Sequence, residues 1–546
     1  MSAEGARHQG VNLSGKRTEL IFLHIYAFLR SDIFVIPLFA YKGEKMEFLE
    51  KLVSTINDYL SGYILVFLLV GVGLYYSIKT KFVQVRCLGE GFKRVFSKND
   101  KSTEKKGLSS FQALATAVAA QVGTGNIVGA CGAILIGGPG AIFWMWIIAF
   151  LGMATNYAEA VLAQKTKTID ENGEVHGGPV YYIKKAFSGK LGKGLAGFFA
   201  VAIIIALGFV GAMVQSNSIT SNIAGVFESF NVDISSYTWI IGIVVALLVG
   251  VIFIGGVKRI ASVTEKLVPI MAIMYIVGGL LVLCVNFKNV PGAIGAIFKY
   301  AFVPQALIGG GFGSAIVKAI QKGAQRGLFS NEAGMGSTPH AHAQADVKDP
   351  HDQGVVAMVG VFIDTFIVLT LTALIVLCTL YTGNGPLASA TGELVNTGLF
   401  GSFSDYAKSI GLTDGNMVQR AFQMTFTTIF GSEAVGNAVG SIFVAICLFF
   451  FAFSTIISWN FFGKINFNYL FGKKATVAYS AIAIVCVFLG SIGSNGLVWG
   501  LSDMFNNLMV IPNVIAMFAL GGMVFEKFNK NKPISVEGSV DAEQNN

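Results

Sequence analysis

Residues 111–134 read FQALATAVAAQVGTGNIVGACGAI, an apolar stretch that is interrupted in its middle by the glycine-rich segment Gln121–Gly129. About 20 apolar residues are enough to cross a hydrocarbon core about 30 Å thick. Because lipid offers the backbone no hydrogen-bond partner, a helix breaks at that depth only where it lines a protein cavity. The stretch therefore predicts a membrane-spanning helix that is broken at a buried site.

The composition of the whole chain agrees with a membrane protein. Of its 546 residues, 53% are hydrophobic and 13% are charged, whereas a soluble domain has about 25% charged residues. The net charge of +8 does not point to nucleic acid, because the basic residues fall between apolar runs, where they orient helices. The six cysteines are scattered without a CxxC spacing, so we expect neither a disulfide framework nor a metal site.

Eleven apolar runs predict an all-α polytopic membrane protein with about eleven transmembrane helices. The predicted spans are residues 60–78, 111–134, 139–163, 195–223, 237–256, 264–286, 303–323, 354–381, 435–460, 475–492 and 498–523. The gaps after the odd-numbered spans are rich in Lys and Arg, which marks the cytoplasmic side. We therefore expect the N-terminus outside and the C-terminus in the cytoplasm.

The two ends of the chain differ from this pattern. Residues 1–45 are basic although they would lie outside, and MEFLEKLVSTINDYL from Met46 reads as an amphipathic lead into the first span. We interpret 1–45 as an N-terminal extension, 46–525 as the transmembrane domain, and 526–546 as a disordered cytoplasmic tail. A helix in the long external gap is predicted at 417–430.

A second glycine cluster, GGGFGS at 309–314, opens the seventh span. The two interrupted spans are the first and sixth of the ten that follow span one, as in a 5+5 inverted repeat preceded by one extra helix. Half-helix N-termini attract an anion such as an amino acid carboxylate, and free carbonyls suit a cation. The candidate substrate site in the first break is Gly123, Thr124, Gly125 and Asn126; the alternative is that these glycines only pack helices closely.

Polar residues in other spans are further candidates. Gln215 and Asn217 should face the bundle interior, as substrate contacts or as hydrogen-bonded links between helices. The hydroxyls of Ser454 and Thr455 could ligate Na⁺ or bond back to their own helix. Trp459 lies one turn after Thr455 and could wall a pocket or simply pack.

Two acids lie deep in predicted spans. Either could be a proton relay, but Glu159 lies nearer a helix end and could instead cap or pair, so Asp364 is the better candidate. The segment 331–343 contains His340 and His342, which without Cys or carboxylate partners at ligand spacing are weak evidence for metal. We interpret that segment as a small-residue loop packed under the bundle. With no nucleophile–base pair in the spans, an enzyme is not expected.

Five of these segments together resemble the alanine or glycine:cation symporter family, over about residues 46–525. They are NEAGMGSTPHAHA (331–343), QVGTGNIVG (121–129), VQSNS (214–218), GVFIDT (360–365) and FAFSTIISW (451–459). The resemblance implies the inverted-repeat fold of the bacterial leucine transporter. It also implies a plasma-membrane carrier that moves a small neutral amino acid with Na⁺ by alternating access.

The resemblance also implies ligand sets. The sodium ligands are the carbonyls near Ala119 and Val122 and the hydroxyls of Ser454 and Thr455. The amino acid ligands are Thr124, Gln215, Asn217 and Phe312, with Trp459 closing the side-chain pocket. No organic cofactor and no obligate protein partner are indicated. The alternatives are a proton-coupled carrier that uses Asp364, and a channel, against which the two separate breaks argue.

Overall fold

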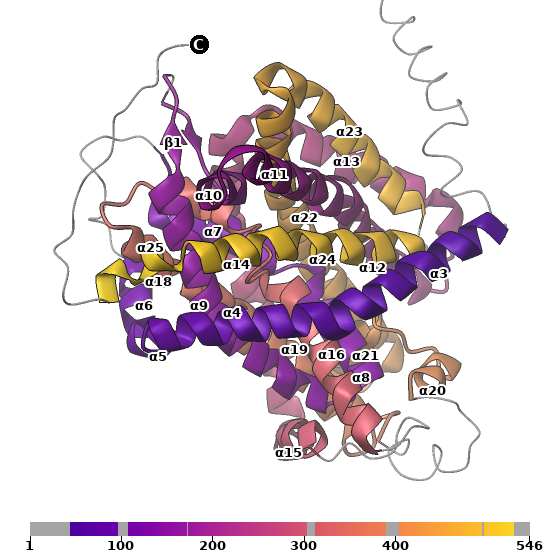
Figure 1. The fold of residues 1–546 in the computed structure, drawn as a ribbon. Coiled ribbons are helices and arrows are strands. Elements are labelled where there is room, and N and C mark those ends of the chain that lie inside the picture. Colours follow the sequence, from indigo (N-terminus) through magenta and orange to yellow (C-terminus); the bar gives the residue numbers. More distant parts are fainter. Residues whose placement is uncertain are drawn as a thin grey trace, which may run out of the picture.

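The computed structural model describes residues 44–96, 107–171, 173–302, 312–388, 403–493 and 496–528 (Figure 1). Within these residues, nine helices are long and apolar enough to cross a membrane, and one bent pair makes a tenth. The chain is therefore an all-α polytopic membrane protein as predicted, but the count of eleven spans is not confirmed. The predicted extension and tail lie almost wholly outside the described residues.

Each of the eleven predicted spans has a helical segment close to it, although α16 (Phe312–Asn331) is not among the ten candidate spans. These segments are α3–η1–α4 (Glu44–Tyr59, Leu60–Ile64, Leu65–Lys79), α7 (Ser110–Gln121) with η2 and α8 (Gly125–Gly129, Ala130–Gly137), α9 (Gly140–Thr166), α11–η3–α12 (Gly189–Ile203, Ile204–Gly211, Ala212–Glu228), α13 (Thr238–Ile254), α14 (Gly256–Val285), α16, α18–η6–α19–η7 (Pro350–Val361, Phe362–Leu369, Thr370–Val376, Leu377–Tyr381), α22 (Glu433–Phe471), α23 (Thr476–Ile492) and α24 (Gly496–Ala519). The shorter elements are α5 (Val83–Arg86), α6 (Leu88–Val95), β1 and β2 (Thr168–Ile169, Val175–His176), α10 (Pro179–Ala186), η4 (Ser235–Tyr237), η5 (Phe287–Asn289), α15 (Val290–Phe302), α17 (Pro339–Ala343), α20 (Phe403–Ser409), α21 (Met417–Phe430), η9 (Lys473–Ala475), α25 (Gly521–Phe525) and η10 (Glu526–Phe528).

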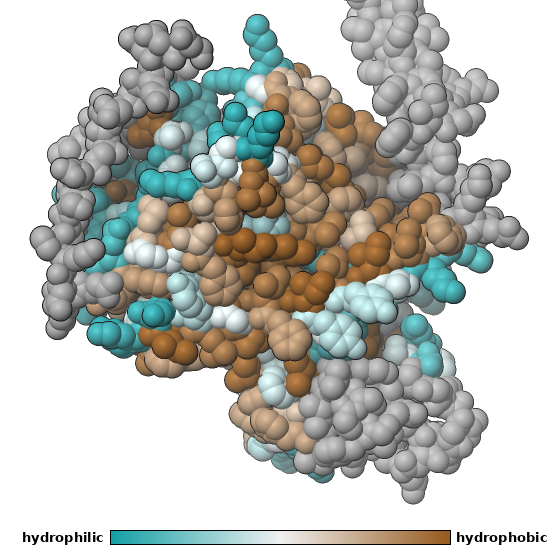
Figure 2. All heavy atoms as spheres, viewed as in Figure 1, coloured by the Kyte–Doolittle hydropathy of each residue, from teal (hydrophilic) through white to brown (hydrophobic). Residues whose placement is uncertain are grey.

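The helices divide into an inner and an outer set. In α9, 72% of the most apolar window is buried inside the protein, against 28% in the span that contains α23 and 33% in α14. The outer helices direct large apolar side chains outward, as Leu247 and Ile254 do on α13. Figure 2 shows such side chains along α4 and α24, with hydrophilic residues gathered at the margins of that face. Lipid is the solvent that this surface fits.

The first broken helix forms as the sequence predicts. Ser109 and Gln112 make a reciprocal capping box that starts α7. The helix stops at Val122, whose backbone (φ −80°, ψ 86°) is no longer helical, and resumes at Gly125. The two halves are bent by 49°. The predicted break within 121–129 is therefore confirmed, and the structure places it at residues 122–124.

The second break lies in a different place from the predicted one. Residues 303–311, with the first three glycines of the GGGFGS cluster, lie outside the described residues, and Phe312 begins a helix that continues to Asn331. The helix ends there, and buried turns from Glu332 to Thr338 lead into α17. Gly334 and Gly336 have φ of +88° and +80° in these turns, a backbone conformation that favours glycine. The segment interpreted as a loop under the bundle is therefore the second break.

This shift also moves two basic residues. Lys322 lies at the end of the predicted seventh span and Arg326 just after it, but both lie within α16. With three basic residues, α16 is less apolar than the other helices, so composition alone does not count it as a span. Glycine clusters mark both a helix start and a helix break, and the sequence pattern did not distinguish them.

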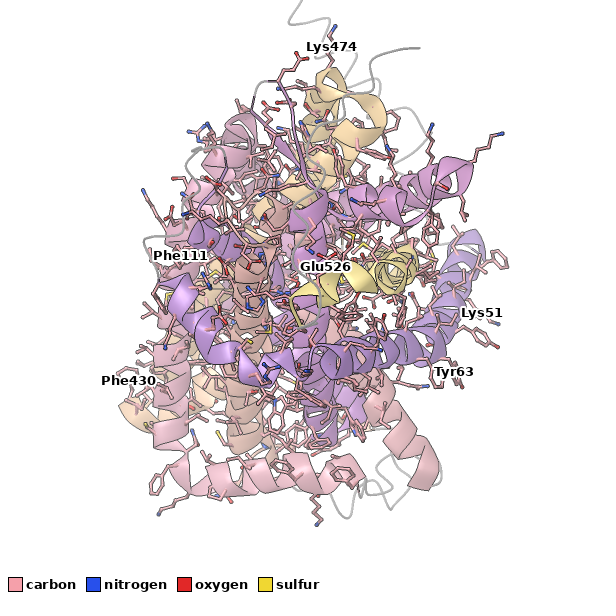
Figure 3. The ribbon with its side chains drawn as sticks, turned by 60° about the vertical axis from the view of Figure 1, so that its left-hand side comes forward. Lys51, Tyr63, Phe111, Phe430, Lys474 and Glu526 are labelled. Carbon is pink, nitrogen blue, oxygen red and sulfur yellow. The ribbon has the colours of Figure 1, made fainter. Side chains whose placement is uncertain are left out.

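Two surface helices lie in the gaps between spans. The predicted helix at 417–430 is confirmed as α21. The sequence did not predict α15, because its apolar run is too short to span a bilayer. It lies at the bottom of Figure 1 and crosses the bottom of Figure 3 lengthwise.

Ion pairs join the basic segments into one face, here called the basic face. Lys473 Nζ lies 2.7 Å from Glu174, Lys165 pairs with Glu526, and Arg94 lies 2.9 Å from Asp352. The segments after spans one, three, nine and eleven therefore meet on the same side of the molecule.

Asp349 shows how these charges act on the basic face. Partial burial acts to raise the pKa of this carboxyl, but the Lys527 ammonium and the His351 backbone amide outweigh it and hold the pKa below its usual value. The carboxylate therefore stays ionised and keeps the C-terminal segment attached to the start of α18.

Candidate functional site

The first break exposes a polar turn in the middle of the bundle. Asn126 folds back so that its Oδ1 accepts a hydrogen bond of 3.0 Å from the Gly123 amide. Thr124 and Asn126 are fully buried. The Thr124 hydroxyl has no hydrogen-bond partner among the residues that the structure describes. A buried hydroxyl without a partner costs free energy, so it is a candidate ligand group for a bound solute.

The C-terminal end of α7 meets α22 at the predicted sodium ligands. Thr455 Oγ1 lies 2.9 Å from the Ala119 carbonyl oxygen. A Cβ atom added to Gly123 would lie only 2.4 Å from the same hydroxyl, so the backbone and the threonine are in close contact. The Thr455 hydroxyl also lies 3.0 Å from the Phe451 carbonyl of its own helix. Ser454 bonds to that same carbonyl and lies 3.4 Å from Met271 Sδ. The structure thus joins Ala119 with Thr455, beside Gly123, whereas the Ser454 hydroxyl turns toward α14.

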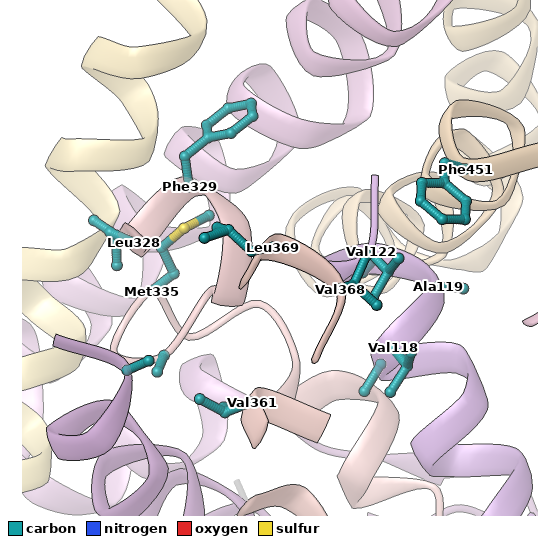
Figure 4. Close-up of a cluster of buried hydrophobic side chains, with 14 of the residues drawn as sticks. Val118, Ala119, Val122, Leu328, Phe329, Met335, Val361, Val368, Leu369 and Phe451 are labelled. Atoms are coloured by element: carbon teal, nitrogen blue, oxygen red, sulfur yellow. The ribbon is translucent and has the colours of Figure 1, made fainter. Parts of the chain in front are cut away.

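The two breaks pack against each other. A Cβ atom on Gly125 would lie 3.1 Å from Ser330 Cα, near the C-terminal end of α16. Asp364, fully buried on η6, accepts hydrogen bonds from Asn126 Nδ2 at 2.6 Å and from Ser330 Oγ at 3.0 Å. Figure 4 shows the apolar side chains of this region, including Val122 and Phe329, drawn from several helices. Asp364 therefore links the two broken helices through their side chains.

Trp459 is attached to the second break. Its indole Nε1 donates a 2.6 Å hydrogen bond to Glu332, and Ser337 Oγ donates to the other oxygen of that carboxylate. The Phe329 ring meets the indole edge to face, with centroids 6.0 Å apart. A Cβ atom on Gly211 would lie 2.7 Å from Cζ3 of the indole. The indole thus contacts both the end of η3 and the end of α16.

The two amides of α12 point in different directions. Gln215 lies one turn after Gly211, on the face that meets Trp459, and both of its amide atoms lack a partner among the described residues. Asn217 lies about 200° further around the helix. It lines a cavity of about 910 Å³ with residues of α16, α21 and α24. Asn217 therefore faces this cavity, here called the vestibule, and is separate from Gln215.

Aromatic rings and an ion pair lie at the vestibule. Trp499 lines it, and the Phe329 ring lies 6.2 Å from Trp499 as well as contacting Trp459. Arg326 also lines it, 3.8 Å from the carboxylate of Asp503 on α24. Phe329 therefore lies between the vestibule and Trp459. It is one helical turn after Arg326 on α16.

Glu159 on α9 holds the second break from the other side. Its two carboxylate oxygens accept from the Gly334 amide at 3.1 Å and from the Gly336 amide at 3.0 Å. Asn513 on α24 donates to the same carboxylate at 2.7 Å. Of the two sequence interpretations for Glu159, capping and pairing with groups of the protein is the one that fits these contacts.

The sequence matches a family of known transporters. Residues 46–542 match the sodium:alanine symporter family. The chain belongs to this family. It is 38% identical over 488 residues to a sodium/alanine symporter of Methanococcus maripaludis, covering 88% of this chain and 98% of that one. It is also 36% identical over 480 residues to a probable sodium/glutamine symporter of Bacillus subtilis, covering 88% and 90%.

Another relative and a solved structure extend the comparison. A putative sodium/proton-dependent alanine carrier of Bacillus subtilis is 39% identical over 473 residues, covering 86% of this chain and 89% of that one. The crystal structure of MhsT in complex with L-phenylalanine matches with a TM-score of 0.50 and 14% identity, covering 78% of this chain and 99% of that one. At this identity the match shows the fold alone. It confirms the predicted leucine-transporter fold, and the chain is a multi-pass membrane transporter and not an enzyme.

The structure separates the predicted ligand Phe312 from the aromatic residue that contacts Trp459. Phe312 is the first residue of α16, and Phe329, which contacts Trp459, is 17 residues further along. At 1.5 Å per residue, these positions are roughly 25 Å apart along the helix. Phe312 therefore begins the end of α16 that is opposite to Phe329.

The sequence interpretation also missed the residues that occupy that place, Phe329, Ser330 and Glu332. The signal was present, because NEAGMG has two glycines directly after a helical run, a pattern typical of a helix end.

Replacing Glu159 by glutamine is expected to destabilise the symporter. One carboxylate oxygen becomes an amide that faces a glycine N–H or the Asn513 donor, so two donors meet. A lost hydrogen bond to a charged group costs about 1.5–3 kcal/mol. The midpoint of thermal unfolding in detergent should fall for Glu159→Gln and stay unchanged for Glu50→Gln, an exposed acid on α3. Equal midpoints would show that the carboxylate does not hold the loop.

Proposed function

We propose that this symporter imports a small neutral amino acid, alanine or glycine, together with Na⁺ across the plasma membrane. The observation that carries the proposal is the pairing of two broken helices, with a buried threonine hydroxyl against the last carbonyls of one of them. Broken helices present backbone dipoles to both an anionic group and a cation. The names of relatives that carry alanine with sodium support this choice of solute.

Na⁺ would bind at the end of α7, to the carbonyls of Ala119 and Val122 and the Thr455 hydroxyl. Its ligands would be oxygen atoms, as a hard cation requires. Ser454 would join only after turning its hydroxyl away from Met271. The bound ion would fix the bend between α7 and η2, and in this way organise the substrate site next to it.

The amino acid would bind between the two breaks. Its carboxylate would meet the amides around Gly123, Gly125 and Asn126, with the unpartnered Thr124 hydroxyl and the Gln215 amide as further contacts. Trp459 and Phe329 would close the space around the side chain. Asn217 would meet the solute earlier, in the vestibule.

Transport would proceed by alternating access around this fixed site. The basic face would lie in the cytoplasm, with the C-terminus, and the vestibule would open to the outside. One Na⁺ that enters down 100 mV contributes about 2.3 kcal/mol, enough for roughly fifty-fold accumulation of a zwitterion.

Uptake of labelled alanine into proteoliposomes tests the proposal. With an inward Na⁺ gradient we expect accumulation that glycine competes, and without the gradient we expect none. Equal uptake with and without Na⁺ would contradict sodium coupling. If Na⁺ drives uptake of glutamine but not of alanine, sodium coupling would stand. The solute would then be glutamine, which is named for one relative.

The Asp364→Asn variant distinguishes sodium from proton coupling. Asparagine keeps one acceptor for Asn126, but the hydrogen bond is no longer assisted by charge and is weaker by about 1 kcal/mol. This loss corresponds to a roughly fivefold change in uptake. We therefore expect reduced uptake that still needs Na⁺. Wild-type uptake that persists without Na⁺, and is lost in this variant, would instead make Asp364 a proton carrier.

Trp459 is proposed to set the size limit for the solute. Trp459→Ala removes the ring between Gly211 and Phe329, so leucine and glutamine should compete for alanine uptake at concentrations at least about tenfold lower. Trp239→Ala is the matched control, because Trp239 is exposed on the outer helix α13. Unchanged selectivity in Trp459→Ala would mean that the indole only packs.

A further inference from the structure

A group of metal-ligand side chains lies on the basic face, roughly 20 Å along α18 and η6 from Asp364, and the proposed transport site does not use it. Cys87 lies between α5 and α6, Glu90 lies in the first turn of α6, and His351 lies in the first turn of α18. The Cys87 thiol, a Glu90 oxygen and a His351 ring nitrogen all lie within 4.8 Å of one another. We propose that these three side chains bind a zinc-like divalent transition metal ion, with water as the fourth ligand.

The geometry fits a tetrahedral ion better than a hydrogen bond. His351 Nε2 and Glu90 Oε2 are 3.5 Å apart, which is long for a hydrogen bond. Two ligands that are each about 2.1 Å from a tetrahedral zinc ion are separated by about 3.4 Å. A thiolate about 2.3 Å from the same ion lies only slightly further from the imidazole. One ion therefore fits between the two atoms, with only small movements of the side chains.

The surrounding residues orient the ligands. Tyr157 Oη lies 2.8 Å from His351 Nδ1, so a bond to the hydroxyl holds the ring with Nε2 toward Glu90. Arg94 pairs with the other oxygen of Glu90 at 3.1 Å, which leaves Oε2 for the ion. Such outer partners typically fix the tautomer and orientation of a metal-bound histidine.

The donor set indicates which ions would bind. Sulfur and imidazole nitrogen favour zinc and similar transition metals over Na⁺, Mg²⁺ or Ca²⁺. Binding replaces the thiol proton, which is released to water. The bound ion would link α6 to the start of α18, two helices already in close contact, because a Cβ atom on Gly91 would lie 2.5 Å from the Val355 carbonyl.

A second group, Asp170, Glu174 and His176, also lies within 4.8 Å but contains no thiol. It lies on the β1–β2 hairpin, where Asp170 already accepts from the Glu174 amide at 2.8 Å and Glu174 pairs with Lys473. This group provides an internal control, because cobalt bound there would have no sulfur ligand.

Cobalt titration of the purified full chain, with a histidine-free purification tag, tests the site. We expect a thiolate-to-cobalt charge-transfer band that saturates at one ion per chain and disappears when zinc is added. The band should be lost in Cys87→Ser and should need about 10- to 100-fold more cobalt in Tyr157→Phe. It should remain in His176→Gln and in Cys284→Ser, which removes an exposed thiol elsewhere. No band in the wild type, or a band that survives in Cys87→Ser, would overturn the proposal.

A second measurement covers the case in which Cys87→Ser does not fold. Zinc should slow alkylation of Cys87 in the wild-type protein at least tenfold, while alkylation of Cys284 stays unchanged. Equal alkylation of Cys87 with and without zinc would overturn the site.

Discussion

Gly123→Ala is expected to lower alanine uptake by about 100-fold while the protein still folds. The new methyl carbon would lie 2.4 Å from Thr455 Oγ1 and 3.3 Å from Thr455 Cβ. A β-branched side chain in a helix has few alternative rotamers. Either α22 moves away from the break, or the hydroxyl turns away from the Ala119 carbonyl. Both outcomes separate oxygen atoms that we propose as sodium ligands.

The measurement is the initial rate of Na⁺-driven alanine uptake, normalised to folded protein by size-exclusion chromatography. Gly197→Ala is the matched control, because Gly197 lies within α11 with no atom within 4 Å of the added methyl. That variant should keep full uptake, since alanine only raises helix propensity there. Wild-type uptake in Gly123→Ala would show that the close contact at the break has no role in transport.

The first break could be predicted from sequence because its cause is local. Two glycines, a threonine and an asparagine lower the helix propensity inside this apolar run. Lipid offers no hydrogen-bond partner to the freed backbone groups, so the break must lie inside the protein. The partners of the break were beyond sequence reasoning. Asn126 meets Asp364 across 238 positions, and Thr455 meets Ala119 across 336. Only the three-dimensional packing brings such positions together, although the family resemblance had already grouped Ala119 with Thr455.

The second break shows where sequence reasoning failed and why. GGGFGS was chosen because glycine breaks helices, yet Phe312–Ser314 begin a helix and the break follows Asn331. The true break contains fewer glycines, and its geometry depends on Glu159, which satisfies the amides of Gly334 and Gly336 from another helix. Phe312 was predicted as a ligand because it was expected at the break, and it lies at the start of α16 instead. Gln215 and Asn217 were predicted together as amino acid ligands, but they lie about 200° apart around α12, and Asn217 lines the vestibule.

Three buried carboxylates surround the breaks, namely Glu159, Glu332 and Asp364. Among the described residues, none forms an ion pair with Lys or Arg, and each is held by hydrogen-bond donors. An ionised carboxylate buried without a fixed cation is costly, so a mobile cation near the breaks would stabilise the ionised form. This arrangement supports the proposal that Na⁺ binds before the zwitterion, which brings no net charge of its own.

Thr455→Val is the substitution that tests this sodium site most directly. Valine has nearly the same shape, but it removes the hydroxyl 2.9 Å from the Ala119 carbonyl. A lost interaction with a charged group costs about 1.5–3 kcal/mol, so the Na⁺ concentration for half-maximal uptake should rise about 10- to 100-fold. The maximal rate at saturating Na⁺ should change much less, because the substrate contacts remain. The experiment is alanine uptake at fixed alanine over a range of external Na⁺.

Thr379→Val is the control for this substitution. The Thr379 hydroxyl is also buried, but it bonds only to carbonyls of its own helix segment, at 2.7 and 3.4 Å. Its removal should leave the Na⁺ dependence unchanged. If Thr455→Val also kept the wild-type Na⁺ dependence while lowering stability, the hydroxyl would only attach α22 to the break, and the coupling ion would bind elsewhere. A higher Na⁺ concentration for half-maximal uptake in Thr455→Val alone would place Na⁺ at the end of α7. There the ion would fix the bend of the first broken helix.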